Sequence, residues 1–126
     1  MPARILVVED SPTILNLLGM VLRQQGFQIH TAGDGVEALE KLSQESVDLI
    51  ITDVNMPRMD GFTLIRRVRA QQSLANLPII VLSTEREDRD LEQGAMVGAN
   101  LYLTKPVKPE VLVEHVQSLL NSQAIS

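Results

Sequence analysis

The sequence predicts an α/β fold in which five parallel strands form one open sheet with helices on both of its faces. Short aliphatic runs alternate along the chain with longer segments whose apolar residues recur every three or four positions. Residues that begin and end helices separate these segments, as Ser11, Pro12 and Gly26 do around the first amphipathic stretch. Because helical crossovers join neighbouring parallel strands, this alternation is typical of a doubly wound sheet with five strands and five helices.

Five segments are short and mainly aliphatic, as expected of strands that are covered on both faces. They comprise residues 5–8, 27–31, 47–51, 79–82 and 101–104. In the second strand Phe27 and Ile29 are expected to point inward. The third strand leads to Asp53 at its end.

Helices are expected between the strands. Five apolar residues of the first helix follow one helical face and are expected to be buried: Ile14, Leu17, Leu18, Val21 and Leu22. Asp34 and Glu37 have the spacing of a capping box for the second helix, and Asp60 is placed to cap the third. The arginines near the end of the third helix are expected to form a solvated face: Arg66, Arg67 and Arg69.

Two further helices complete the pattern. Thr84 and Glu87 could form a capping box for a fourth helix that ends near Gly98. Pro109 opens a fifth helix whose inward residues would be Leu112, Val116, Leu119 and Leu120. The chain from Asn121 onward is expected to be frayed.

Composition limits the function. The 126 residues suit one domain over residues 1–126, with a core at about 3–121 and a flexible tail at 122–126. A net charge of −5 and the lack of tryptophan argue against a nucleic-acid surface. No apolar run approaches the roughly 20 residues that cross a bilayer, and no signal peptide is recognisable. With no cysteine either, we expect a cytoplasmic protein without membrane contact.

Polar residues follow four of the five predicted strands. They are Glu9 and Asp10, Asp53, Ser83 and Thr84, and Thr104 and Lys105. The carboxyl ends of strands form the functional crevice of a doubly wound sheet, so these side chains are expected to meet there. Three carboxylates in one crevice would raise one another's pKa, and a hard divalent cation would relieve the repulsion.

Magnesium matches this set of residues because it prefers oxygen ligands and takes one or two carboxylates. Asp10 and Asp53 are the best direct ligands, and Glu9 could hold a coordinated water. The backbone carbonyl of Asn55 could fill another position, while Lys105 supplies a point charge for a phosphoryl oxygen. A carboxylate beside a metal is a possible nucleophile toward phosphorus, so the crevice suits phosphoryl transfer.

These residues resemble the response-regulator receiver domain of two-component signalling. The resemblance rests on V-V-E-D-S at 7–11, D-V-N-M-P-x-M-D-G at 53–61, Ser83, Tyr102 and K-P at 105–106. It covers roughly residues 3 to 121 and is nearest to the stand-alone, chemotaxis-type (CheY-like) regulators. The resemblance implies a flavodoxin-like sheet with strand order 2-1-3-4-5, and a role in chemotaxis, motility or related signalling.

The resemblance also implies the chemistry of the crevice. Asp53 would accept a phosphoryl group from a sensor histidine kinase. Asp10, Asp53 and the Asn55 carbonyl would bind Mg²⁺, with Glu9 in the outer shell. Lys105 would pair with the phosphoryl group. The chain would have no separate substrate and would catalyse only its own phosphorylation and dephosphorylation.

A switch is implied as well. Ser83 would move to bond a phosphate oxygen, and Tyr102 would follow from an outward to an inward rotamer. Asn55 and Glu85 would tune autodephosphorylation, and the peptide bond from Lys105 to Pro106 would be cis. The face built from the fourth helix, the fifth strand and the fifth helix would bind a downstream protein, and the unphosphorylated chain would be a monomer.

Three other functions remain open at the level of sequence. A Mg²⁺-dependent phosphatase with an aspartyl nucleophile usually needs a second acid two residues further on, where this chain has Asn55. A flavin- or nucleotide-binding module would need a glycine-rich phosphate loop, but VVEDSPT at 7–13 contains no glycine. The chain could also be a receiver that docks on a partner and never switches.

Overall fold

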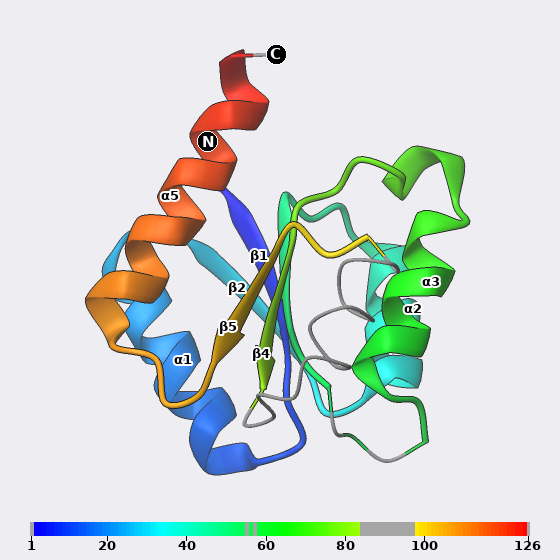
Figure 1. Ribbon diagram of the computed structural model, residues 1–126, viewed down its shortest axis with the longest axis horizontal. Coiled ribbons are helices and arrows are strands. Elements are labelled where there is room, and N and C mark those ends of the chain that lie inside the picture. Colours follow the sequence, from blue (N-terminus) through cyan, green and yellow to red (C-terminus); the bar gives the residue numbers. More distant parts are fainter. Residues whose placement is uncertain (1, 55, 57, 84–97, 126) are drawn as a thin grey trace.

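The order of strands and helices follows the sequence prediction. The computed structural model describes residues 2–54, 56, 58–83 and 98–125 (Figure 1). The strands are β1 (Arg4–Val8), β2 (Gln28–Ala32), β3 (Leu49–Asp53), β4 (Ile79–Ser83) and β5 (Leu101–Thr104). The helices are α1 (Pro12–Gln24), α2 (Gly35–Gln44), α3 (Gly61–Arg69) and α5 (Pro109–Ile125), with a 3₁₀ turn at Gln72–Leu74. The expected fourth helix, with Thr84 and Glu87, lies outside the described residues.

All strand pairs are parallel, and the strand order is β2-β1-β3-β4-β5. Figure 1 shows α1 and α5 on one face of the sheet and α2 and α3 on the other. The expected doubly wound, flavodoxin-like fold is therefore confirmed. Within the described ranges, none of the helices combines the length and apolar character that a bilayer-spanning segment requires.

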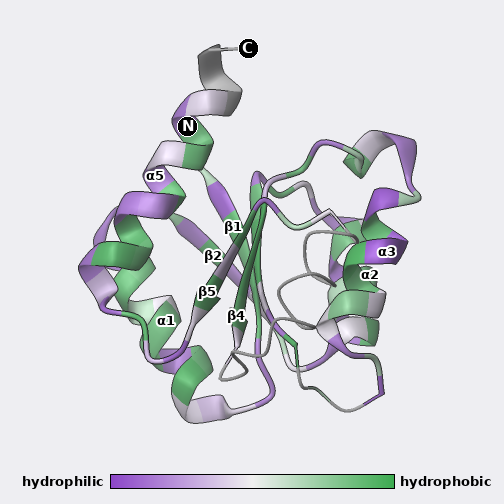
Figure 2. Cartoon of the chain, in the orientation of Figure 1, coloured by the Kyte–Doolittle hydropathy of each residue, from purple (hydrophilic) through white to green (hydrophobic). Residues whose placement is uncertain are grey.

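Each face of the sheet has its own apolar layer, because alternate strand residues point in opposite directions. Strand residues on the side of α1 and α5 are Ile5, Val7, Leu49, Ile51, Ile80 and Leu82. Those on the side of α2 and α3 include Leu6, Val8, Ala32, Ile50, Ile79 and Val81. The strands form an apolar centre between the more polar outer faces of the helices (Figure 2). Leu112 and Val116 of α5 are buried against the sheet, as predicted.

Helix starts follow the predicted caps. The Asp34 carboxylate accepts a hydrogen bond from Glu37 N at 2.9 Å, and the Asp60 carboxylate accepts one from Thr63 N at 2.8 Å. The Glu37 carboxylate accepts from Gly33 N at 2.9 Å, one residue before the position that a capping box would use. The start of α2 is thus tied to the end of the preceding loop.

The predicted inward face of α1 is partly wrong. Leu17 is 51% exposed, whereas Leu15, outside the predicted stripe, packs in the core with Leu18 and Leu22. Apolar residues occupy so much of this helix that two overlapping stripes have helical spacing. The position of α1 over the sheet decides which stripe is buried.

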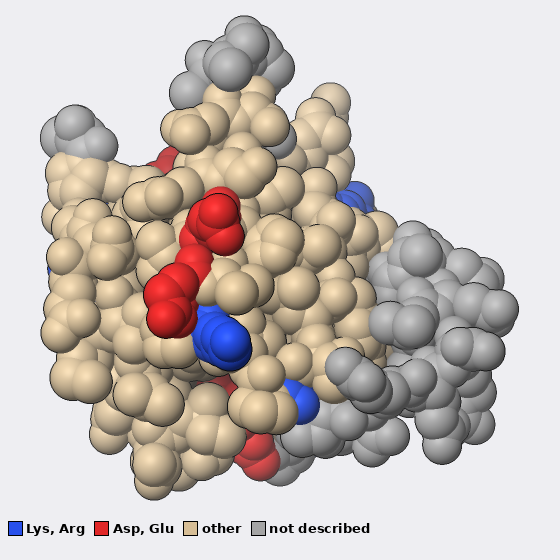
Figure 3. Space-filling model, turned by 60° about the vertical axis from the view of Figure 1, so that its left-hand side comes forward, with Lys and Arg blue, Asp and Glu red and all other residues tan. Residues whose placement is uncertain are grey.

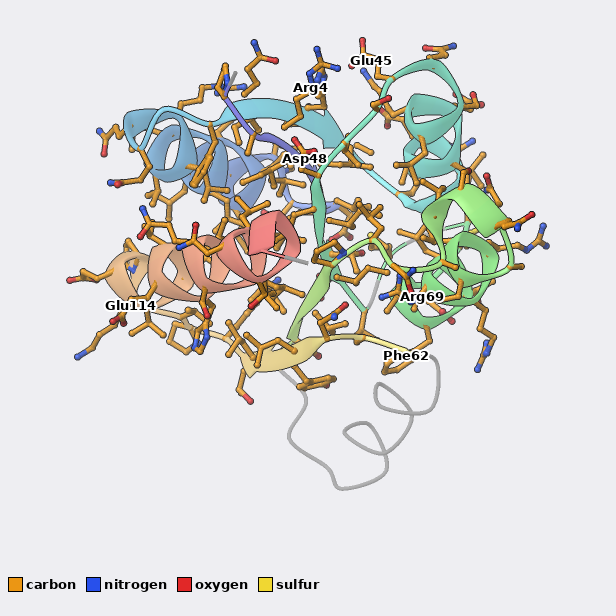
Figure 4. The ribbon with its side chains drawn as sticks, turned by 90° about the horizontal axis from the view of Figure 1, so that it is seen from above. Arg4, Glu45, Asp48, Phe62, Arg69 and Glu114 are labelled. Atoms are coloured by element: carbon orange, nitrogen blue, oxygen red, sulfur yellow. The ribbon has the colours of Figure 1, made fainter. Side chains whose placement is uncertain are left out.

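The prediction of a solvated arginine face is wrong for Arg69, which is only partly exposed. In Figure 4 its side chain lies between α3 and the strands. Its guanidinium group makes five hydrogen bonds of 2.7 to 3.2 Å, to the carbonyls of Gly98, Leu74 and Leu77 and to Asn100 Oδ1. Burial lowers the pKa of Arg69 from its ordinary value. Arg69 therefore joins α3 to the chain on both sides of β4.

At its carboxyl end α5 continues to Ile125, and the expected flexibility of the tail remains a prediction. No glycine or proline interrupts residues 110–126, so nothing in the local sequence stops the helix at Asn121. Leu119 and Leu120 pack against the core just before this point.

Replacement of Arg69 by Ala is expected to lower the free energy of unfolding by about 2 kcal/mol, because several partly buried carbonyl groups lose their hydrogen-bond donor. Arg66→Ala, on the exposed side of the same helix, is the matched control and should cost about 0.5 kcal/mol or less. Urea denaturation measures both. Equal, small losses would contradict the structural role of Arg69.

Candidate functional site

Three carboxylates meet where β1 and β3 end. Glu9, Asp10 and Asp53 each offer an oxygen, and these oxygens lie within 4.8 Å of one another. Glu9 and Asp53 are buried, at 3% and 8% exposure, while Asp10 is exposed. The parallel neighbours β1 and β3 bring them together, as the sequence predicted. The group combines hard oxygen donors with an open side toward solvent.

Lys105 lies among these acids directly after β5. Its Nζ atom is 2.7 Å from Glu9 Oε2 and 3.3 Å from Asp53 Oδ2. The Lys105 amide donates to the Ser83 carbonyl at 2.7 Å, which fixes the start of the following loop to β4. The peptide bond between Lys105 and Pro106 is cis.

The carboxylate of Asp53 is oriented by the backbone that follows it. Its Oδ1 atom accepts a hydrogen bond from Val54 N at 2.7 Å. The Val54 carbonyl accepts from Gly61 N at 2.9 Å, which closes the loop between β3 and α3. A Cβ atom on Gly61 would lie 2.2 Å from the Asp53 carbonyl oxygen, so the close return of the chain requires glycine.

The acids and the lysine change one another's pKa. Burial raises the pKa of Glu9, and the charge of Asp53 adds to this, against the lowering effect of the hydrogen bond from Lys105. Burial acts to lower the pKa of Lys105, but the hydrogen bond to Glu9 and the nearby negative charges outweigh it, so this pKa is raised. The stabilisation from Lys105 is therefore present below pH 10.5 and is lost as the pH rises through the higher, folded-state pKa.

Other predicted site residues lie around this group. Ser83 is buried at the end of β4, one position beyond Leu82, which pairs with Asp53. Tyr102 lies in β5 and is partly buried against the core layer on the side of α2 and α3. Asn55 and Glu85 lie outside the described residues, so their expected roles remain predictions.

An apolar groove next to Lys105 was not anticipated from the sequence. Its volume is about 360 Å³, and its lining residues are Ile14, Leu17, Leu18, Leu82, Lys105, Pro106 and Val107. Figure 3 brings the α1 and α5 side forward and shows few charged side chains on it. The only sequence signal was an α1 with more apolar residues than one buried stripe requires.

Comparison with known proteins shows to which family the chain belongs. The sequence profile of the response regulator receiver domain matches residues 5–117. The chain belongs to this family. The expected resemblance is therefore confirmed. Receiver domains bind Mg²⁺ at an acidic pocket, and Glu9, Asp10 and Asp53 form an acidic cluster in this chain.

Several curated proteins contain a similar receiver domain. The sensor protein EvgS of Escherichia coli is 44% identical over 115 residues, which are 91% of this chain and 9% of EvgS. The alkaline phosphatase synthesis transcriptional regulatory protein PhoP of Bacillus subtilis is 36% identical over 126 residues, 100% of this chain and 52% of PhoP. The chain thus spans about half the length of PhoP and about a tenth of the length of EvgS.

Solved receiver domains have the same fold. The chemotaxis protein CheY4 of Vibrio cholerae has a TM-score of 0.90 and 39% identity, covering 94% of this chain and 99% of that chain. The receiver domain of a histidine kinase from Syntrophus aciditrophicus has a TM-score of 0.90 and 41% identity, covering 95% of this chain and 91% of that chain.

Replacing Lys105 with Met is expected to destabilise the receiver domain by about 2–3 kcal/mol at pH 8, because Glu9 stays buried beside Asp53 without a cation. The loss should shrink at pH 5. Glu9 has a raised pKa, and its protonation removes the uncompensated charge.

Urea unfolding at the two pH values measures this difference, with the exposed Lys108→Met variant as control. A loss at pH 5 as large as that at pH 8 would contradict the electrostatic account.

Proposed function

We propose that this receiver domain is a phosphorylation-activated switch that accepts a phosphoryl group on Asp53. One observation carries the proposal: the Asp53 carboxylate lies 3.3 Å from the Lys105 ammonium and within reach of two further acids. Such a set provides a nucleophile, a cation for a phosphoryl oxygen and ligands for a metal. In this proposal residues 1–126 act as one cytoplasmic domain without a separate substrate.

Magnesium is the proposed cofactor. Oxygen atoms of three carboxylates lie within 4.8 Å of one another, and carboxylate oxygens are ligands that Mg²⁺ prefers. Asp10 and Asp53, with the Asn55 carbonyl, would hold the ion directly, and Glu9 would hold it through water. When bound, the ion supplies positive charge that offsets the negative charge of the acids and of the phosphoryl oxygens.

Phosphorylation transfers the group from a phosphohistidine of a sensor kinase. A carboxylate oxygen of Asp53 forms a bond to phosphorus while the P–N bond of the donor breaks. The imidazole nitrogen keeps the electron pair and takes a proton. Lys105, already 3.3 Å from Asp53, pairs with a phosphoryl oxygen. In autodephosphorylation, water attacks phosphorus and the Asp53 carboxylate is restored with release of inorganic phosphate.

The switch would pass from Asp53 to the surface through Ser83 and Tyr102. The hydroxyl of Ser83 would bond a phosphoryl oxygen, and Tyr102 would turn inward behind it. Asn55 and Glu85 would tune the lifetime of the phosphorylated state. The face that includes β5 and α5 would then bind a downstream protein, as phosphorylation shifts the balance between two conformations. The unphosphorylated domain would be a monomer.

The apolar groove beside Lys105 is the proposed docking site of the kinase. Lys105 lines both the groove and the acidic site, so a helix in the groove places its histidine close to Asp53. Leu17 is half-exposed, lines the groove and offers apolar area to such a helix.

The similarity to chemotaxis protein CheY4 supports chemotaxis or motility as the pathway.

Tyr102 fluorescence tests the switch, because the chain has one tyrosine and no tryptophan. Adding acetyl phosphate or beryllofluoride with Mg²⁺ is expected to change the emission of the wild-type protein. Asp53→Ala and removal of Mg²⁺ by EDTA should each abolish the change, because nucleophile or metal is lost. An identical change of emission in Asp53→Ala would contradict the proposal.

Leu17→Gln is expected to slow phosphotransfer from a phosphorylated histidine kinase by about tenfold, because it weakens apolar docking. Phosphorylation by acetyl phosphate, which needs no docking, should stay within about twofold of wild type. Thr13→Gln, at an exposed position of the same helix, is the control. Equal slowing with both donors would show that Leu17 acts on the site and not on docking.

A further inference from the structure

The loop from β3 to α3 is fastened to the start of α2 by an ion pair. Arg58 Nε and Nη2 lie 2.8 and 2.7 Å from Asp34 Oδ2. The other oxygen of this carboxylate, Oδ1, accepts the hydrogen bond from Glu37 N that caps α2. Asp34 is itself buried. One carboxylate therefore holds both the first turn of a helix and the loop that follows the proposed phosphorylation site.

The backbone of Arg58 adopts an unfavourable conformation in this contact. Its φ of 65° is the one positive φ of a non-glycine residue in the parts of the chain that the structure describes. A residue with a Cβ atom takes this conformation only where its surroundings hold it. The pair with Asp34 is a restraint of this kind.

A second contact lies directly beside the ion pair. Met59 packs on Gly35, the first residue of α2, so closely that a Cβ atom on this glycine would lie 2.8 Å from Met59 Cγ. Two consecutive loop residues, Arg58 and Met59, thus meet two consecutive residues at the start of α2. The loop is held at a defined place on the helix.

The same loop sets the orientation of the Asp53 carboxylate. Val54 N donates to Asp53 Oδ1, and Val54 O accepts from Gly61 N at the far end of the loop. The loop is therefore attached at three places: to the Asp53 carboxylate, to its own end at Gly61, and through Arg58 to Asp34. Through the described residues, Arg58 is connected to Val54 by Met59, Asp60 and the hydrogen bond from Gly61 N, and Val54 N contacts Asp53.

We propose that Arg58, held by Asp34, is a positioning residue that keeps the Asp53 carboxylate aimed for phosphoryl transfer. The inference rests on the proposed function and adds a residue to it outside the acidic site. Arg58 itself does not touch the reacting atoms. Its loss lets the loop move from α2, and a small displacement of the Val54 amide then misaligns the nucleophile, which is costly for a reaction that depends on positioning.

The test measures phosphorylation by acetyl phosphate with Mg²⁺ in a double-mutant cycle. Arg58→Ala and Asp34→Asn should each slow the reaction by about fivefold, and the double variant should be no slower than either, because both remove one contact. Asparagine is a good N-cap, so Asp34→Asn keeps the cap of α2. Arg58→Lys, which keeps the charge, should recover to within about twofold of wild type.

Arg58→Gly separates positioning from folding. Glycine accepts a positive φ without strain, so this variant should have a Tm no lower than that of Arg58→Ala but should react as slowly. Amide exchange at Val54 and Gly61 should be faster in both variants, and exchange at Val81 in β4 unchanged. Arg66→Ala is the charge-matched control and should react at the wild-type rate.

Two results would overturn the inference while the proposed function stands: wild-type rates in Arg58→Ala and Asp34→Asn, or a double variant slowed by the product of the single effects. A wild-type protein that is not phosphorylated on Asp53 would overturn both.

Discussion

Three carboxylates meet at one edge of the sheet, and the ammonium group of Lys105 lies among them. This arrangement is electrostatically unfavourable in two ways: carboxylates with the same charge repel one another, and a buried lysine loses its hydration unless it is paired. Lys105 meets both Glu9 and Asp53 and so offsets the acids. The compensation is incomplete, since burial and Asp53 still raise the pKa of Glu9. The negative charge that remains on the acids can therefore attract a metal cation, and the ammonium group of Lys105 can attract an anionic group.

The sheet is what brings these charges together. β1 and β3 are direct neighbours, and β4 and β5 follow in order, so four distant segments end at the same edge. The apolar layers on both faces hold the strands in register, which fixes where each end residue lies. The loops then refine the site. Gly61 lets the chain return onto Asp53, and Arg58 ties the same loop to α2.

The sequence was informative where one residue's neighbours decide its position. The strand ends, the caps at Asp34 and Asp60, and the gathering of the acids with Lys105 follow from local pattern and the sheet rule. The sequence was less informative where contacts with distant segments decide between arrangements that the local pattern allows equally. Both apolar stripes of α1 are helical, and nothing near Arg69 reveals the carbonyls that it meets. The pair between Arg58 and Asp34 joins residues 24 positions apart and has no local signal.

The central claim is that the charges at this edge make Asp53 the phosphoryl acceptor. Borohydride reduction converts an acyl phosphate on aspartate into homoserine, which mass spectrometry locates in the sequence. After treatment with acetyl phosphate and Mg²⁺, the account predicts homoserine at position 53 alone, and none when EDTA is present. Homoserine at another position, or labelling of position 53 that does not depend on Mg²⁺, would contradict it.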